Sequence, residues 1–191
     1  MMLAPAAPRA AGSVSGTRYA AETFQNRDAF AVKPLEAHLD AITLLREDHK
    51  LLRKLSKELA DTTEAAVETR KKLLKRLETE LKAHTTIEEE LFYPALLDAS
   101  DDIEDARKVA EGIEEHRACD RKVIPDLHKA DPSSIAYSGE AKVLKDYIFH
   151  HLEEEEEEMF PKVRELIGRK ELQELGEKMM ARKEELLGEM A

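Results

Sequence analysis

Apolar residues recur along most of this chain at alternating steps of three and four residues, which is the period of one face of an α-helix. From about residue 35 onward the pattern is interrupted only by short polar or proline-containing stretches. It predicts five helices, at about residues 35–59, 62–92, 101–129, 138–167 and 170–190.

Several residues indicate where these helices begin, bend or end. Asp61 with Glu64 three residues later is typical of a capping box, and it predicts the start of the second helix. Pro94 is expected to help end that helix, because proline cannot donate a backbone hydrogen bond. Pro125 is expected to kink or fray the third helix, and Pro161 is expected to kink or break the fourth.

Two of the predicted apolar faces are interrupted by polar residues in the same way. The run from His84 to Pro94 returns as the run from His151 to Pro161, and each copy places a glutamate four residues after its histidine. On a helix this spacing puts both side chains on one face, about 5–6 Å apart. Burial of an unpaired carboxylate costs several kcal/mol. A positive charge is therefore needed beside Glu88 and Glu155.

The first and third helices each add one histidine to an apolar face, His49 and His116. A single buried histidine is more often a hydrogen-bonded core residue than a metal ligand, and for either residue alone that interpretation holds. Together with the two repeats they favour a two-metal site, because ligands from facing helices build such sites in bundles. Mixed imidazole and carboxylate ligands suit iron, manganese or zinc without choosing among them. Bridging carboxylates hold two metals about 3.5–4 Å apart.

Composition agrees with an all-α fold. The chain has 191 residues, of which 42% are hydrophobic and 37% charged, with no tryptophan. We expect an antiparallel four-helix bundle at residues 36–167, with an N-terminal arm at residues 1–35 and an amphipathic C-terminal helix at residues 168–191. The arm is expected because residues 1–17 are rich in Ala, Pro, Gly and Ser.

Charge and cysteine content limit the expected partners and setting. The net charge of −11 argues against general affinity for nucleic acid or anionic membranes. No apolar run reaches the roughly 18 residues that a membrane span requires. Cys119 is the only cysteine, so no intrachain disulfide is possible, and a reducing, cytoplasmic setting is the simplest expectation.

The combined pattern resembles the hemerythrin-like family, also called the HHE cation-binding domain, over roughly residues 38–165. The matching residues are His49, His84-x-x-x-Glu88, His116 and His151-x-x-x-Glu155, with the endings Phe92-Tyr93-Pro94 and Met159-Phe160-Pro161. The resemblance implies two non-haem iron ions, oxo- or hydroxo-bridged, in a four-helix bundle. It implies that His49 and His84 bind one iron, that His116 and His151 bind the other, and that Glu88 and Glu155 bridge them.

The sequence departs from the oxygen-carrying members of that family, which look to have two histidines four apart in the third helix. Here Gly112 and Asp120 lie four residues to either side of His116. The carriers also have an aspartate five residues after the last histidine, where this chain has Glu155 at step four. One imidazole is thus missing, and we expect an extra coordination position.

These departures favour a protein that binds and turns over a small oxidant. Hydrogen peroxide is the expected substrate, with O2 or NO as other ligands, and the activity would be catalase-like peroxide decomposition. The alternative is an iron- or oxygen-sensing module without turnover, which would act with a protein partner or as a homodimer. Ferroxidase or storage chemistry is a third possibility.

Three further residues lie near the expected site. Tyr147 lies one turn before His151, so it either packs in the core or acts catalytically, through a hydrogen bond to a bound oxygen species or as a ligand. Asp120 is either an extra ligand or the partner of an imidazole N–H. Glu158 is expected at the mouth of the site. His38, His128 and His150 lie off the relevant positions and are not expected to be ligands.

Overall fold

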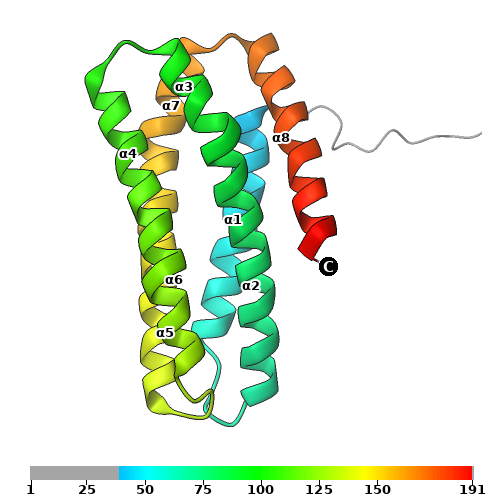
Figure 1. Ribbon diagram of the computed structural model, residues 1–191, viewed down its shortest axis with the longest axis vertical. Coiled ribbons are helices and arrows are strands. Elements are labelled where there is room, and N and C mark those ends of the chain that lie inside the picture. The colour runs from blue at the N-terminus through cyan, green and yellow to red at the C-terminus, as the bar shows by residue number, and fades with distance from the viewer. Residues whose placement is uncertain (1–38, 191) are drawn as a thin grey trace, which may run out of the picture. The chain divides into compact units, whose positions relative to one another are not determined.

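The computed structural model describes residues 39–190, in which helices joined by short connections are the regular elements and no strand occurs. Four antiparallel helical columns form a bundle (Figure 1), which confirms the predicted fold class. The columns are α1 (Ala41–Ala60), α2 (Val67–Ile87) continued by α3 (Tyr93–Ala99), α4 (Ile103–Ala118) continued by α5 (Ile124–Lys129), and α6 (Ile135–Glu154) continued by α7 (Phe160–Leu166). The expected extra helix is α8 (Arg169–Met190). The predicted arm at residues 1–35 lies outside the described residues.

Three of the four columns contain a five-residue π-helical segment immediately before an X-Pro pair. These segments are η2 (Glu88–Phe92), η3 (Cys119–Val123) and η4 (Glu155–Met159). In an α-helix the proline ring clashes with the carbonyl four residues earlier. The wider π turn, with its bonds to the fifth preceding residue, relieves this clash. The Tyr93 N–H, for example, donates to the Glu88 carbonyl.

Two expectations about helix ends are therefore wrong. Pro94 does not end its column, because η2 accommodates it and the helix continues as α3 to Ala99. Asp61 and Glu64 do not form a capping box, because Asp61 ends α1 and pairs with Lys57. The second helix begins only at Val67, five residues later than Thr62 at the predicted start.

The bundle core consists of two apolar clusters, one on each side of a layer of buried histidines and glutamates. Along α1, for example, Ile42 and Leu45 belong to one cluster, Leu52 and Leu55 belong to the other, and His49 lies between them. The polar residues that interrupt the predicted apolar faces are thus inside the protein.

Helix α8 packs against α1 and α2 outside the four columns (Figure 1). Its buried residues Leu172, Met179 and Leu186 join the apolar cluster at that end of the bundle. Gly176 allows the closest approach, since a Cβ there would lie 2.3 Å from the Leu39 carbonyl oxygen and 2.8 Å from the Ala41 nitrogen. None of the described helices is long and apolar enough to cross a membrane.

This contact predicts opposite effects for the same change at two glycines of α8. Gly176→Ala should lower the free energy of unfolding by about 2 kcal/mol, because neither backbone can yield without displacing α8. Gly188→Ala should raise it by up to about 1 kcal/mol, because a methyl group there meets nothing within 4 Å and alanine favours the helix. Urea denaturation followed by circular dichroism measures both. Equal effects would contradict this docking of α8.

Candidate metal centre

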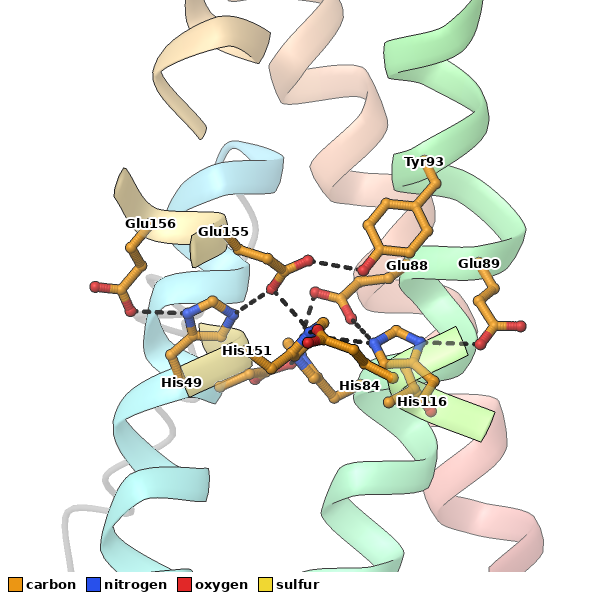
Figure 2. A network of polar contacts seen from close by, with 12 residues as sticks. His49, His84, Glu88, Glu89, Tyr93, His116, His151, Glu155 and Glu156 are labelled. Atoms are coloured by element: carbon orange, nitrogen blue, oxygen red, sulfur yellow. Dashed lines mark hydrogen bonds and ion pairs between the residues drawn. The ribbon is translucent and has the colours of Figure 1, made fainter. Parts of the chain in front are cut away.

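All six predicted ligands converge on the layer between the two apolar clusters (Figure 2). They come from all four columns, and each is buried, with side chains between 0% and 8% exposed. They are His49 on α1, His84 on α2, Glu88 at the start of η2, His116 on α4, His151 on α6 and Glu155 at the start of η4.

Each glutamate lies between two imidazoles from different pairs of helices. Glu88 has its Oε1 3.2 Å from His84 Nε2 and its Oε2 3.4 Å from His116 Nε2. Glu155 Oε2 lies 3.3 Å from His49 Nε2 and 3.7 Å from His151 Nε2.

The ligand atoms form two groups, each within 4.8 Å. One group contains His49, His84, Glu88 and Glu155, and the other contains His116, His151 and Glu88. Two cations could therefore lie side by side, with Glu88 common to both groups.

A carboxylate faces the outer nitrogen of every one of the four imidazoles. Glu156 lies 2.8 Å from His49 Nδ1, and Glu89 lies 2.9 Å from His116 Nδ1 (Figure 2). Glu115 lies 2.7 Å from His151 Nδ1, and Asp48 lies 3.6 Å from His84 Nδ1. An Nδ1–H that donates to a carboxylate leaves Nε2 free for a metal and makes the imidazole a better ligand.

The sequence analysis missed these four carboxylates, although the sequence carries a signal for them. Asp48 and Glu115 directly precede the two single histidines, and Glu89 and Glu156 directly follow the two inward glutamates. A helix turns by about 100° per residue, so the neighbour of an inward residue can reach the imidazole of an adjacent helix.

Many polar atoms of the layer lack a hydrogen-bond partner. They include Nε2 of His49 and His84, both carboxylate oxygens of Glu88, and Oε2 of Glu155. Unsatisfied buried groups of this kind are rare and costly in native proteins. Cations would satisfy all of them at once, so the residues present fit a pair of metal ions.

The protonation states of two of the four imidazoles also suit metal binding. Burial lowers the pKa of His84 to about 4 and also lowers that of His116. Both imidazoles are then neutral, as metal ligation requires. Burial and the nearby Glu155 carboxylate raise the pKa of Glu88 well above its ordinary value. Burial would likewise raise the pKa of Glu155, but the surrounding imidazoles, His151 foremost, lower it.

Tyr93 is a further residue of the site that the sequence analysis quoted only as part of the repeat. Its buried hydroxyl donates to Glu155 Oε1 at 2.8 Å (Figure 2). Burial raises the pKa of Tyr93 well above 10, so it keeps its proton. Gly112 makes room for this hydroxyl, because a Cβ there would lie 2.9 Å from the Tyr93 oxygen. Tyr93 thus lies against Gly112, one of the two positions, four residues from His116, at which an oxygen carrier would have its second histidine.

The two halves of the layer differ in their surroundings. On the His49 and His84 side, cations cover the outer carboxylates, with Arg53 2.5 Å from Glu156 and Lys183 paired with Asp48. Lys183 comes from α8 and is 11% exposed, and Asp48 is 7% exposed. The C-terminal helix thus reaches His84 through one carboxylate.

The other half lies beside a cavity of about 710 Å³ between α2, α4 with η3, and α6. His116 and His151 line it, together with Glu89 and Glu115. Small molecules can therefore approach the layer from this side, through the half that carries His116 and His151.

The remaining predicted residues are placed as follows. Tyr147 lines the cavity, and its hydroxyl donates to the Glu115 backbone carbonyl at 3.3 Å. Asp120 also lines the cavity, whereas His116 Nδ1 is met by Glu89. Three other residues form exposed ion pairs: Glu158 with Lys108, His128 with Glu78, and His150 with Glu154. Lys108 and Glu154 line a small cavity that also contacts His151 and Glu155, so Glu158 lies near one edge of the layer.

The contact between α8 and the layer predicts a selective loss of stability. Lys183→Met keeps the length of the side chain but leaves Asp48 buried without its cation, so the free energy of unfolding of the metal-free protein should fall by about 3 kcal/mol. Lys178→Met, at an exposed position of the same helix, should change it by less than about 0.5 kcal/mol. Chemical denaturation measures the free energy of unfolding of both variants. Equal stability would show that the Lys183–Asp48 ion pair does not contribute to stability.

Burial of His84 predicts how stability depends on pH. The unfolded chain takes up a proton at the ordinary pKa of 6.5, but the folded protein does so only near about 4. The metal-free protein should therefore lose up to about 3 kcal/mol as pH falls between these values. His84→Gln removes the titrating group and with it this pH-dependent loss of unfolding free energy. The difference in unfolding free energy between the variant and the wild type should therefore change over that pH range. Parallel pH curves would contradict the assigned burial.

Comparisons with known proteins agree with this geometry. The protein-family model described as "Hemerythrin HHE cation binding domain" matches residues 40–163 of this chain. Uncharacterized proteins of Mycobacterium tuberculosis and Mycobacterium bovis are 30% identical over 151 residues, which cover 78% of this chain and 89% of theirs. The crystal structure of a hemerythrin HHE cation-binding domain-containing protein from Mycobacterium kansasii superposes with a TM-score of 0.69 at 32% identity, over 79% of this chain and 89% of that one. The family match, the shared fold and the buried histidine–glutamate clusters lead to one conclusion: this chain belongs to the hemerythrin HHE cation-binding domain family.

Proposed function

We propose that the polar layer binds two iron ions, oxo- or hydroxo-bridged, and that the protein uses them to decompose hydrogen peroxide. His49 and His84 would hold one ion, His116 and His151 the other, with Glu88 and Glu155 shared between them. The observation that carries this proposal is the set of buried, unpartnered nitrogen and oxygen atoms on His49, His84, Glu88 and Glu155, beside which the inward nitrogens of His116 and His151 lie 3.0 Å apart. An iron pair supplies the two-electron capacity with which one peroxide is oxidised to O2 while another is reduced to two waters.

The protein's own residues have defined tasks in this proposal. Asp48, Glu89, Glu115 and Glu156 orient the four imidazoles through their outer nitrogens. Glu88 gives up a proton when cations enter, because its raised pKa favours the protonated form in the metal-free protein. Tyr93 keeps its proton and holds Glu155 Oε1, which leaves Oε2 directed at the ions.

The cavity supports the entry of a small oxidant at one side. His49 and His84 are fully buried behind Arg53, Lys183 and α8, whereas His116 and His151 line the open cavity. Peroxide, and O2 or NO as other ligands, would therefore arrive at the half held by His116 and His151. Tyr147 lies on this route and remains a candidate for a hydrogen bond to the entering molecule.

The contact through α8 favours a second candidate, an iron- or oxygen-sensing module. Lys183 joins α8 to Asp48, and Asp48 faces Nδ1 of His84, the nitrogen on the side of the ring opposite the metal-binding Nε2. A cation bound at His84 Nε2 would thus add positive charge close to the buried Lys183–Asp48 ion pair that joins α8 to the bundle. A protein partner, or a second copy of the chain, could respond to the resulting change at α8.

Adjacent histidines provide a matched test of the site. His151→Ala should lower iron from about two per chain to one or fewer, because it removes an inward nitrogen of the second group. His150→Ala should leave iron content unchanged, because that side chain is 64% exposed and outside the layer. Elemental analysis after anaerobic reconstitution measures both. Equal iron content in the two variants would contradict the assignment of His151 as a metal ligand.

Turnover is tested separately on the iron-loaded protein. Addition of hydrogen peroxide under argon should release O2, and an oxygen electrode measures the rate. The His150→Ala variant should match the wild type, and His151→Ala should lose most of the rate. Two irons per chain without O2 release would contradict turnover and favour the sensing module. No stoichiometric metal would contradict both functions.

A further inference from the structure

Two cavities share one residue pair beside the metal layer. Glu115 and His151 line the large cavity, and both also line a second cavity of about 40 Å³ between α4, α6 and η4. Since one water needs about 10–15 Å³ of such space, the second cavity has room for roughly three waters. It is therefore too small for an organic molecule but large enough for a cation that keeps a few of its waters.

The small cavity connects the protein surface with buried ligands of the layer. Glu111, which is exposed, lines it together with Glu155 and His151, which are 3% and 7% exposed. Oε2 of Glu155 has no hydrogen-bond partner, and it lies 3.7 Å from Nε2 of His151 (Figure 2). A cation that enters this cavity therefore reaches a buried carboxylate oxygen that still lacks a partner.

The two cavities differ in the charge of their walls. Among the described side chains, the large cavity has four acidic and four basic ones: Glu78, Glu89, Glu115 and Asp120, with Lys75, Lys82, Arg117 and Arg121. The small cavity has four acidic ones and one basic one: Glu111, Glu115, Glu154 and Glu155, with Lys108. Lys108 is itself paired with Glu158. Because a narrow space lined by one sign of charge concentrates the opposite ion, the small cavity favours cations and the large one does not.

Two carboxylates in the wall of the small cavity lie close enough to share a cation. An oxygen of Glu115 and an oxygen of Glu154 are within 4.8 Å of each other. Carboxylate oxygens are good ligands for divalent cations and can replace part of their water. The exposed His150 lies near the same oxygens but does not line the cavity, so it is not part of this path.

We propose that divalent cations reach the layer through the small cavity, past Glu111 and Glu154, whereas neutral oxidants enter by the large cavity. Glu111 and Glu154 attract the hydrated cation, Glu115 and Glu154 replace part of its water, and Glu155 with His151 receives it. This route rests on the metal site proposed above. It adds that metal loading and oxidant entry use separate openings.

Cobalt(II) is the probe for loading, because its visible absorption changes when protein ligands replace its waters. Stopped-flow mixing with the metal-free, full-length protein measures the rate, and the final absorbance measures the number of ions bound. Glu111→Gln combined with Glu154→Gln should slow loading about three- to tenfold at low ionic strength, with the same final number of ions. Added salt should reduce this difference, because it screens the carboxylates.

Two double variants with the same change of net charge serve as controls. Glu114→Gln with Glu153→Gln alters exposed residues outside both cavities, and Glu78→Gln with Asp120→Asn alters the large cavity. Each should load cobalt within about twofold of the wild-type rate. Lys108→Met should instead speed loading about two- to threefold, because it removes the basic side chain from the wall of the small cavity.

The outcomes separate the route from the metal site. Unchanged loading of the Glu111 and Glu154 variant, equal slowing by the surface variant, or slowing by the large-cavity variant alone would overturn the route and keep the metal site. Fewer bound ions in the Glu111 and Glu154 variant would make these residues ligands of the final site, which would also overturn the route. Failure of the wild type to bind cobalt would contradict the metal site, and the route with it.

Discussion

The burial of two carboxylates in the middle of a helical bundle is the constraint on which the rest of this structure depends. Glu88 and Glu155 are at most 3% exposed and lie between apolar clusters that would otherwise form one continuous core. Water cannot solvate them there, and no lysine or arginine reaches them among the described ion pairs. Four inward imidazoles, three hydrogen-bonded to a carboxylate at the outer nitrogen and the fourth facing one at 3.6 Å, are the arrangement that makes this layer a place for cations.

The layer follows the internal repeat of the chain, yet neither repeat provides a complete site. Asp48 and Glu115 each hold the histidine of the next column in their own half of the chain. Glu89 and Glu156 instead hold the single histidine of the opposite half. Glu88 likewise lies between one imidazole from each half. This crossing of contacts couples the two halves, so binding of cations should stabilise the bundle as a whole.

The sequence predicted the helices and the six inward residues because helical periodicity and the repeated H-x-x-x-E spacing are both local signals. It did not predict the partners of those residues, because Glu156 and His49 are 107 positions apart and meet only in the folded bundle. The role of Lys183 depends in the same way on where α8 docks, which Gly176 decides by its lack of a side chain. The prediction that Pro94 ends its helix was wrong because proline disrupts a helix when an α-helical turn precedes it, and here the preceding turn is π-helical.

The π-helical turns before these prolines also change which face of the helix the following residues occupy. A wider turn shifts every following residue by a fraction of a helical turn relative to an unbroken α-helix. Tyr93 and Phe160, just beyond two such turns, therefore lie on a face that the spacing of the preceding ligands would not assign to them. A histidine–glutamate pair transplanted into a regular designed helix would keep its local spacing but would lose the aromatic residues that close over the layer. For protein design, the transferable unit is the pair together with its proline.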